Sequence, residues 1–237
     1  LLGELLYERG QLDEAETLLD DAYELGAEGG IVDFMLAAFG TGARLKSARG
    51  DVAAAQRRLF EGLDIARTLQ LPRLEARLLN ESVRVAAPLG EAIDDSLAQR
   101  ITRSGSAQFD GIVGVAAELM EDSRIRLLLT DGTPSALSDA CERARARFDQ
   151  LDQGKRPRAH LQATLQLALC LGMAGNTDEA VRVLSPALRT CAALGLSQLI
   201  VDEGPQMLRL ANDAVSDPSA SASVRDFVQS LAEPSNV

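Results

Sequence analysis

The sequence is poor in the residues that build β-sheets and flat stacking sites. It has no Trp, two Tyr and six Phe, so aromatics make up 3% of its 237 residues. Sheets rely on β-branched and aromatic side chains to pack a pleated surface. Ala, Leu, Arg and Glu are abundant instead, and these residues lose little conformational freedom in a helix. The composition therefore predicts an all-α protein.

Residues that carry metal-binding and catalytic chemistry are also scarce. The sequence contains one histidine, His160, and three widely separated cysteines, Cys141, Cys170 and Cys191. Metal sites and nucleophile–base pairs need such residues in defined groups. We therefore expect no enzyme activity, no catalytic residue, no metal site and no cofactor. His160 is expected to be solvated or to cap a helix, and the cysteines to pack inside helices in a reducing cytoplasm.

Long apolar runs and an excess of positive charge are missing as well. No stretch of about 18 apolar residues occurs, so we expect no membrane-spanning helix. The N-terminus lacks an initiator Met and the basic start of a secretory signal. The net charge is −11, whereas surfaces that bind nucleic acid are basic. These features predict a cytoplasmic piece of a longer protein that does not itself contact nucleic acid.

A glycine recurs after successive amphipathic segments. Gly10, Gly50, Gly90, Gly132 and Gly175 are 40, 40, 42 and 43 residues apart. A glycine that follows a helix takes up the left-handed conformation, so this spacing predicts turns between antiparallel helices. Seven residues before each glycine lie Gly3, Ala43, Val83, Ile125 and Ala168. Small or apolar residues in a fixed register allow helices to approach closely. The third unit, around residues 88–102, fits the register poorly.

Periodicity and turn residues predict a series of short helices. They span Leu1–Arg9, Leu12–Leu25, Ile31–Ala48, Val52–Leu69, Arg73–Ala87, Glu91–Ile101, Ile112–Thr130, Pro134–Leu151, Arg158–Ala174, Asp178–Leu194, Pro205–Ala214 and Ser223–Leu231. The polar segment Thr102–Asp110 is the expected mobile loop. Because no single helix pair can bury its apolar side, the pairs must stack in sequence order.

The predicted fold is therefore a right-handed α-α superhelix of tetratricopeptide-like helix hairpins. We expect it to form one domain over residues 1–237, with about five helix pairs in residues 1–194 and capping helices in residues 195–237. The first helix of each pair is expected to line the concave side.

A ladder of arginines is predicted on this concave side. Six residues before the turn glycines lie Glu4, Arg44, Arg84, Arg126 and Leu169. Arg77 lies two turns before Arg84 and would join the ladder, and Tyr7 and Asn80 complete the predicted binding face. Guanidinium groups make bidentate contacts, so the ladder suits an anionic ligand or an acidic peptide. The alternative is that these arginines are solvated or pair with nearby carboxylates.

Two sequence patterns resemble known proteins. The turn Arg9–Ala15 is echoed by Ala174–Ala180, and its Gly-x-x-x-Glu-Ala pattern resembles tetratricopeptide repeats. The stretch Gln198–Met207, with the sequence QLIVDEGPQM, resembles the end of the sensor region in MalT-type regulators of the LuxR family. Within that stretch, Asp202–Pro205 also suits a helix start, because Pro fits the first turn and carboxylates favour the helix N-terminus.

The resemblance implies a place in a larger transcription activator. Such proteins combine a nucleotide-binding ATPase, a tetratricopeptide-like sensor and a DNA-binding helix-turn-helix. This chain has no Gly-x-x-x-x-Gly-Lys-Ser/Thr phosphate loop, so it corresponds to the sensor and oligomerisation part, with the ATPase and DNA-binding domains outside it. A small-molecule effector or a protein partner would bind the concave face, and assembly into a homo-oligomer is a further expectation. The scarce aromatics give no support to an oligosaccharide ligand.

A different class of function fits the same repeats. A stand-alone adaptor would hold a peptide or protein partner in its groove, with no ATPase or DNA-binding domain attached. The reading frame on both sides of the chain separates these two hypotheses.

Overall fold

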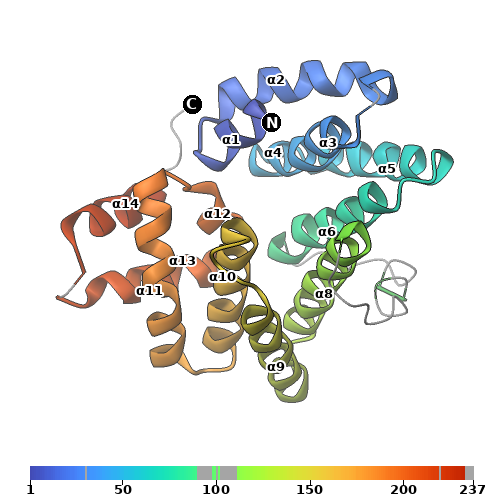
Figure 1. Cartoon of the computed structure of the whole chain (residues 1–237). Helices are drawn as coiled ribbons and strands as arrows, with labels where there is room; N and C mark the ends of the chain where they lie inside the picture. The colour runs from blue at the N-terminus through green and yellow to red at the C-terminus, as the bar shows by residue number, and fades with distance from the viewer. Residues whose placement is uncertain (30, 90–97, 100, 102–110, 219, 233–237) are drawn as a thin grey trace. The chain divides into compact units, whose positions relative to one another are not determined.

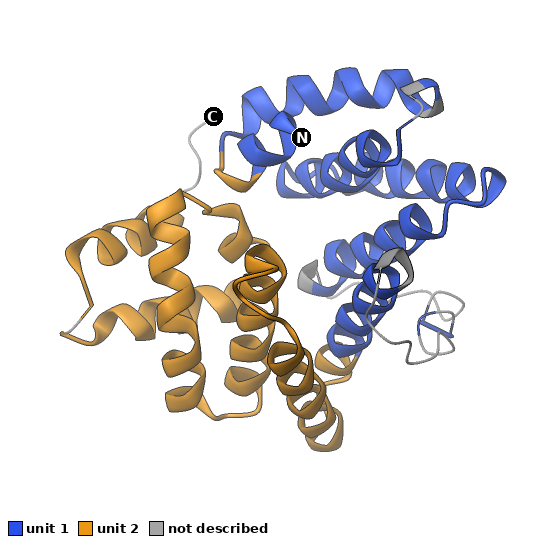
Figure 2. Cartoon of the chain, in the orientation of Figure 1, with its two compact units in different colours: residues 1–7, 11–127 blue, residues 8–10, 128–237 orange. Residues whose placement is uncertain are grey.

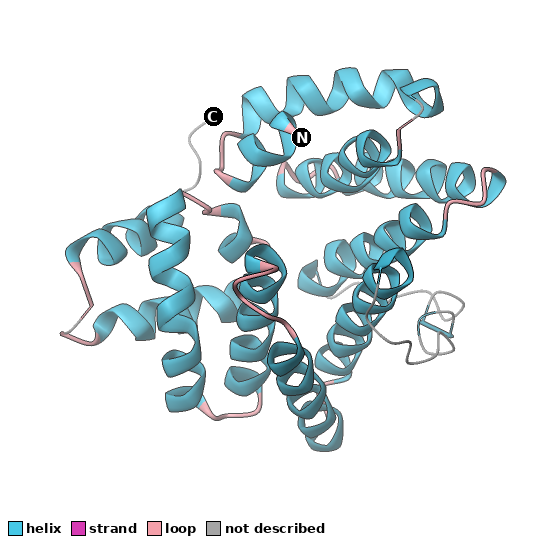
Figure 3. Cartoon of the chain, in the orientation of Figure 1, coloured by secondary structure: helices cyan, strands magenta, loops and turns pink. Residues whose placement is uncertain are grey.

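The computed structural model describes the chain except for residues 30, 90–97, 100, 102–110, 219 and 233–237 (Figure 1). Throughout the described residues the secondary structure is helical, with connecting loops and no strand (Figure 3). The all-α prediction is therefore confirmed. The expected mobile loop Thr102–Asp110 and most of the predicted helix Glu91–Ile101 lie outside the described residues.

The chain divides into two compact units (Figure 2). Unit 1 contains residues 1–7 and 11–127, and unit 2 contains residues 8–10 and 128–237. The expectation of one continuous superhelix over residues 1–237 stays a prediction.

Unit 1 is built from antiparallel helix pairs. Its elements are α1 (Leu2–Glu8), α2 (Leu12–Leu25), η1 (Gly26–Gly29), α3 (Val32–Met35), η2 (Leu36–Thr41), α4 (Gly42–Ala48), α5 (Val52–Thr68), α6 (Pro72–Leu89) and most of α8 (Gly111–Asp131). The first helix of the second pair comprises α3, η2 and α4, and its middle part η2 is a π-helix rather than an α-helix. Helix α4 packs against α2, α5 and α6, so the pairs stack in chain order.

Unit 2 repeats the helix-pair design around a more deeply buried helix. Its elements are α9 (Pro134–Gln150), α10 (Pro157–Met173), α11 (Thr177–Leu194), α12 (Gln198–Val201), α13 (Pro205–Ser216) and α14 (Ala222–Ala232). Helix α10 packs against α9, α11 and α13, and nearly every residue from Leu161 to Leu171 is buried. The short helix α12 falls inside the stretch that resembles MalT-type regulators and was not predicted as a separate element.

The turn glycines have the conformation that their spacing predicts. Gly10, Gly50, Gly132 and Gly175 have φ values of 72°, 81°, 66° and 84°, in the left-handed region that favours glycine. Gly90 lies outside the described residues. After Gly50, the amide N–H of Asp51 donates to the carbonyl of Lys46 at 2.9 Å, which is the bond that closes a Schellman turn.

The small-residue register marks the helix contacts. The five residues that lie seven positions before the turn glycines are all buried: Gly3, Ala43, Val83, Ile125 and Ala168. On α5, a Cβ atom added to Gly62 would lie 2.8 Å from atoms of Leu78 and Phe39, so only glycine permits this approach of α5 to its neighbours. The recurrence seen in the sequence therefore has a packing cause.

Candidate functional site

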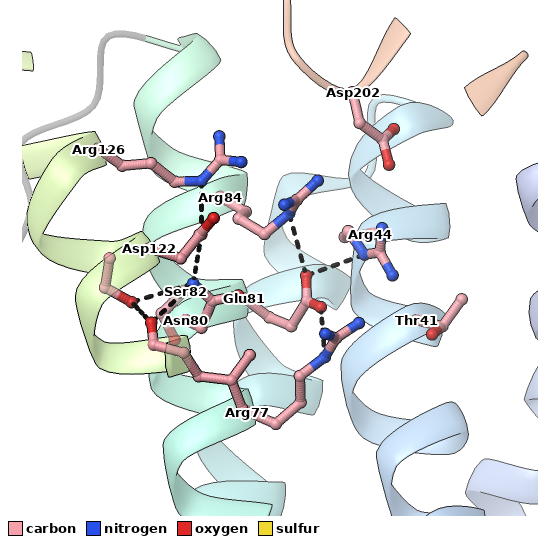
Figure 4. A network of polar contacts seen from close by, with 12 residues as sticks. Thr41, Arg44, Arg77, Asn80, Glu81, Ser82, Arg84, Asp122, Arg126 and Asp202 are labelled. Atoms are coloured by element: carbon pink, nitrogen blue, oxygen red, sulfur yellow. Dashed lines mark hydrogen bonds and ion pairs between the residues drawn. The ribbon is translucent and has the colours of Figure 1, made fainter. Parts of the chain in front are cut away.

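A buried carboxylate lies among three arginines in unit 1 (Figure 4). Glu81 on α6 has no exposed surface. Its two oxygens lie 2.9 Å from Nε of Arg44 on α4, 2.8 Å from Nε of Arg77 and 3.9 Å from Nε of Arg84. Arg77 and Arg84 flank Glu81 one turn away on α6, whereas Arg44 reaches it from the preceding helix pair. We call these four residues the arginine–glutamate cluster.

The charge of Glu81 depends on these neighbours. Burial alone would raise the pKa of the Glu81 carboxyl, because a buried charge loses its hydration. The positive charges of Arg44, Arg77, Arg84 and Arg126 outweigh burial and hold this pKa below its usual value. Glu81 is therefore ionised at neutral pH, and the cluster is a set of buried ion pairs rather than a neutral hydrogen-bonded group.

A second buried polar group joins α6 to α8. The side-chain amide nitrogen of Asn80, which is 1% exposed, lies 2.7 Å from Oδ2 of Asp122, 3.0 Å from Oγ of Ser123 and 3.2 Å from the carbonyl oxygen of Leu119. Nε of Arg126 donates to the same Asp122 oxygen at 2.8 Å. The positive charge of Arg126 also acts on Glu81, so the two groups are electrostatically connected.

Helix α1 contributes two more contacts to the same face. The guanidinium carbon of Arg44 lies 5.3 Å from the centre of the Tyr7 ring, within the range of a cation–π interaction. Thr41 donates its hydroxyl proton to Oε1 of Glu4 at 3.3 Å. Because Thr41 precedes Arg44 by one turn, both contacts connect the first helix pair to the second.

The π-helical turn η2 lies directly before Arg44. A π-turn contains an additional residue, so the residues after it are rotated relative to those of a straight α-helix. Arg58 of α5 places Nη1 3.4 Å from the carbonyl oxygen of Ala38 within η2. A Cβ atom on Gly42 would collide with that same nitrogen. Arg58 and Gly42 thus stabilise the irregular turn that sets the direction of Arg44.

All seven residues predicted for the binding face belong to unit 1, and each of them takes part in one of these contacts. They are Glu4, Tyr7, Arg44, Arg77, Asn80, Arg84 and Arg126. The arginines pair with carboxylates: Arg44, Arg77 and Arg84 with Glu81, and Arg126 with Asp122. Pairing with nearby carboxylates was part of the alternative to a ligand-binding ladder, and the structure shows this pairing. Their part in binding a ligand stays a prediction.

The sequence analysis missed four polar residues of the site, two of which are acidic. Glu81, Ser123 and Thr41 each lie nine residues before a turn glycine, and Asp122, like the predicted Asn80, lies ten before. The register that located the arginines would have located these polar residues too, had it been extended by one helical turn.

Other candidate chemistry finds no support in the described residues. They contain no group of three or more His, Cys, Asp or Glu residues that could hold a metal ion, and none of their helices is long and apolar enough to cross a membrane. Cys170 and Cys191 are buried and Cys141 is half-buried, and burial raises the pKa of the Cys191 thiol to about 12. The His160 ring packs on Phe148, with ring centres 4.8 Å apart, so it is not fully solvated.

Comparison with known proteins identifies two kinds of similarity. The model of the MalT-like TPR region matches residues 1–217. The chain is also similar to the serine/threonine-protein kinase PknK of Mycobacterium tuberculosis (strains CDC 1551 / Oshkosh and ATCC 25618 / H37Rv) and of Mycobacterium bovis (strain ATCC BAA-935 / AF2122/97). The identity is 43% over 206 residues in each case, covering 86% of this chain and 18% of the relative. The chain therefore spans less than a fifth of the length of the curated relatives that it matches.

Proposed function

Because this chain belongs to the MalT-like TPR region family, we propose that it is the signal-sensing and protein-interaction domain of a larger bacterial regulator. The family match over residues 1–217 is the observation that carries this proposal. Stacked helix pairs present extended faces to partners, and the described residues offer no metal cluster that would favour an enzyme. We propose a cytoplasmic, non-catalytic domain that needs no cofactor and does not itself bind nucleic acid.

The proposed binding face is the arginine–glutamate cluster together with the Asn80–Asp122–Arg126 group. Its ligand would be anionic, either a small molecule or an acidic peptide, because guanidinium groups recognise carboxylate and phosphate. Such a ligand would compete with Glu81 and Asp122 for the arginines. Helices α4, α6 and α8 all contribute to these ion pairs, so exchange of partners would change how the helices are held. The ligand would shift the helices from one arrangement to another only if it binds the second arrangement more tightly than the first.

The parts that would receive the signal are a separate question. The resemblance at Gln198–Met207 suggests a LuxR-family regulator with an ATPase and a DNA-binding domain. The identity of 43% with PknK favours a second candidate, in which the domain serves a serine/threonine kinase. An open reading frame that encodes a phosphate loop before the domain and a helix-turn-helix after it would support the first candidate. A kinase domain in the frame would support the second candidate. A frame that encodes none of these domains would support the stand-alone adaptor.

Ligand binding can be tested by thermal shift, since a ligand that binds only the native state raises the melting temperature. The chain would be screened against nucleotides, sugar phosphates, dicarboxylates and acidic peptides. Compounds that raise the melting temperature would then be titrated by calorimetry against the wild type and the variant R44A/R84A/R126A. The matched control is R9A/R57A/R189A, which removes three exposed arginines.

The expected result is a loss of affinity of at least tenfold in the first variant only. Circular dichroism establishes that each variant remains folded at the temperature of the titration. If R44A/R84A/R126A remained folded and bound as tightly as the wild type, the ligand would have to bind elsewhere. Equal losses in both triple variants would point to a general charge effect rather than to a site.

A further inference from the structure

Asp20 on α2 lies at the centre of a polar group that shares no residue with the arginine–glutamate cluster. One of its carboxylate oxygens accepts a hydrogen bond from the guanidinium group of Arg58 on α5, and the other lies 2.8 Å from Nζ of Lys46 on α4. Burial alone would raise the pKa of the Asp20 carboxyl, but the hydrogen bonds and charges of Lys46 and Arg58 outweigh burial and hold this pKa below its usual value. Asp20 is therefore ionised at neutral pH and holds both cations.

Arg58 reaches the π-helical turn of the neighbouring helix. Its Nη1 atom lies 3.4 Å from the carbonyl oxygen of Ala38 in η2, and its guanidinium carbon lies 4.2 Å from the centre of the Tyr23 ring on α2. At the end of η2, the N–H of Gly42 donates to the carbonyl of Ala37, five residues back, whereas an α-helix uses the carbonyl four residues back. Arg58 therefore connects this irregular turn to α2.

Lys46 and Arg44 hold α4 from opposite sides. A separation of two residues in an α-helix corresponds to a rotation of about 200°, so the two side chains leave α4 in nearly opposite directions. Nζ of Lys46 lies 2.8 Å from Asp20 and 2.6 Å from Glu16, both on α2, whereas Arg44 pairs with Glu81 of α6 at 2.9 Å. A rotation of α4 about its own axis could not keep both sets of ion pairs.

We propose that Asp20 and Arg58 are positioning residues of the proposed binding face. Asp20 holds Lys46 directly and holds η2 through Arg58, so it sets the rotation of α4 that places Arg44 on Glu81. The Asp20 side chain is 39% exposed, so a residue at the surface of α2 controls a buried group on the other side of α4. The proposal rests on the proposed function for one consequence, that the affinity for an anion depends on Asp20.

The Nε–H proton of Arg44 reports this positioning without any ligand. Nε of Arg44 lies 2.9 Å from the Glu81 carboxylate, so this proton should exchange slowly with water, and NMR measures the exchange rate. Arg77 is the internal control, because its Nε lies 2.8 Å from the same carboxylate but it belongs to α6, which carries Glu81 itself. In Asp20→Asn we expect exchange at Arg44 to accelerate at least tenfold, and exchange at Arg77 to change by less than about twofold.

Two further variants act on Arg58. Arg58→Met removes the guanidinium group and keeps an apolar side chain. Gly42→Ala would displace the guanidinium group from η2, because the added Cβ atom would collide with Nη1, although alanine favours a helix more than glycine does. Both variants should accelerate exchange at Arg44 and not at Arg77. The matched control is Arg147→Met, which removes a buried arginine of unit 2 that is 7% exposed, and it should leave both signals unchanged.

Titration with a hexaglutamate peptide by calorimetry measures the consequence for binding. Asp20→Asn should weaken binding at least tenfold in the wild type and by less than about twofold in Arg44→Ala, because Asp20 acts through Arg44. Removing a negative charge would by itself favour an anion, so the expected weakening has the opposite sign to a general charge effect. If hexaglutamate bound none of these chains, the proposed function would lose support, and the exchange rates would still decide the role of Asp20.

Three results would overturn the proposal. The first is unchanged exchange at Arg44 in Asp20→Asn and Gly42→Ala, which also decide the matter if Arg58→Met does not fold. The second is equal acceleration at Arg44 and Arg77, because the whole cluster would then have loosened without a specific rotation of α4. The third is an equal loss of hexaglutamate affinity on Asp20→Asn in the wild type and in Arg44→Ala.

Discussion

Equivalent positions in the helix pairs of the two units carry charged residues in unit 1 and uncharged residues in unit 2. Nine and six residues before the turn glycine, α6 of unit 1 has Glu81 and Arg84, whereas α10 of unit 2 has Gln166 and Leu169. The unit 1 residues form buried ion pairs. In α10, Leu169 is buried among apolar residues, and Gln166 accepts a hydrogen bond of 2.6 Å from Arg147.

The difference shows that the first helix of a pair can be buried without a charged residue at these two positions. Unit 2 stacks with an almost entirely apolar first helix, and replacing buried ion pairs with apolar residues is often neutral or stabilising. The charges of unit 1 therefore call for a reason other than stability. Recognition of an anionic partner is the reason that we propose, and the predictions below test whether the two units differ as this comparison requires.

The largest expected loss of stability follows from removing the charge of Glu81 in unit 1. Glu81→Gln removes the carboxylate shared by Arg44, Arg77 and Arg84, and breaking a buried ion pair by removing one partner costs about 3–5 kcal/mol. Urea denaturation followed by circular dichroism measures the loss. The control is Glu14→Gln at an exposed position of α2, which should change the free energy of unfolding by less than about 0.5 kcal/mol. Similar small changes in both variants would show that Glu81 is not structurally central.

The apolar packing of unit 2 is tested at Leu165 of α10, which is 1% exposed. Leu165→Ala should lower the free energy of unfolding by about 2–5 kcal/mol, since it removes buried methyl groups and leaves a cavity. Leu194→Ala, at a position that is 52% exposed, is the matched control and should have little effect. A loss below about 1 kcal/mol for Leu165→Ala would mean that the apolar packing of α10 does not hold unit 2 together.

Lowering the pH should remove the contribution of the Glu81 charge to the free energy of unfolding. Its ordinary carboxyl pKa is 4.5 and its pKa in the folded protein is lower. A lowered carboxyl pKa stabilises the folded state fully above the ordinary value, and this stability is lost as the pH falls through the folded pKa. The difference in unfolding free energy between wild type and Glu81→Gln should thus be constant above about pH 5 and shrink below pH 4.5. Urea titrations between pH 7 and pH 3 measure it, and a difference that did not change over this range would contradict the assigned charge.

The smallest expected effects lie in the turns and should be the same in both units. Gly50 and Gly175 have φ values of 81° and 84°, and a Cβ atom added to either would meet no atom beyond its chain neighbours within 4 Å. Alanine at either site should therefore lower the free energy of unfolding only by the cost of holding a residue with a Cβ atom in the left-handed conformation, about 1–2 kcal/mol. Melting temperatures of Gly50→Ala and Gly175→Ala should fall by similar amounts. Clearly different shifts would show that the turns, and not only the first helices, distinguish the units.

The helix pairs could be predicted from the sequence because their signals are local. The helix Leu12–Leu25 was predicted with its observed bounds, and the turn glycines depend on a backbone conformation that only glycine adopts readily. The interruption of Ile31–Ala48 by η2 was missed, since a π-turn depends on tertiary contacts such as that from Arg58 to Ala38. Helix α12 has four residues, which are too few to show a hydrophobic periodicity in the sequence.

The candidate site was predictable in part for the same reason. A fixed register placed Arg44, Arg84 and Arg126 at equivalent positions, so their shared face followed from the sequence. Helical spacing could also have given the partners of Arg77, Arg84 and Arg126, which lie three or four residues away on the same helix. The pairing of Arg44 with Glu81 could not be predicted, because it requires α4 and α6 to lie side by side. Burial of these charges is likewise a property of the assembled helices and cannot be read from one helix alone.

Segment-resolved hydrogen exchange of Glu81→Gln tests the central claim most directly. If the arginine–glutamate cluster holds α4 and α6 together, amide exchange in these two helices should be faster in the variant than in the wild type, and α10 and α11 should exchange at unchanged rates. Equal acceleration throughout both units, or no acceleration in α4 and α6, would contradict the claim that unit 1 depends on buried charge where unit 2 depends on apolar packing.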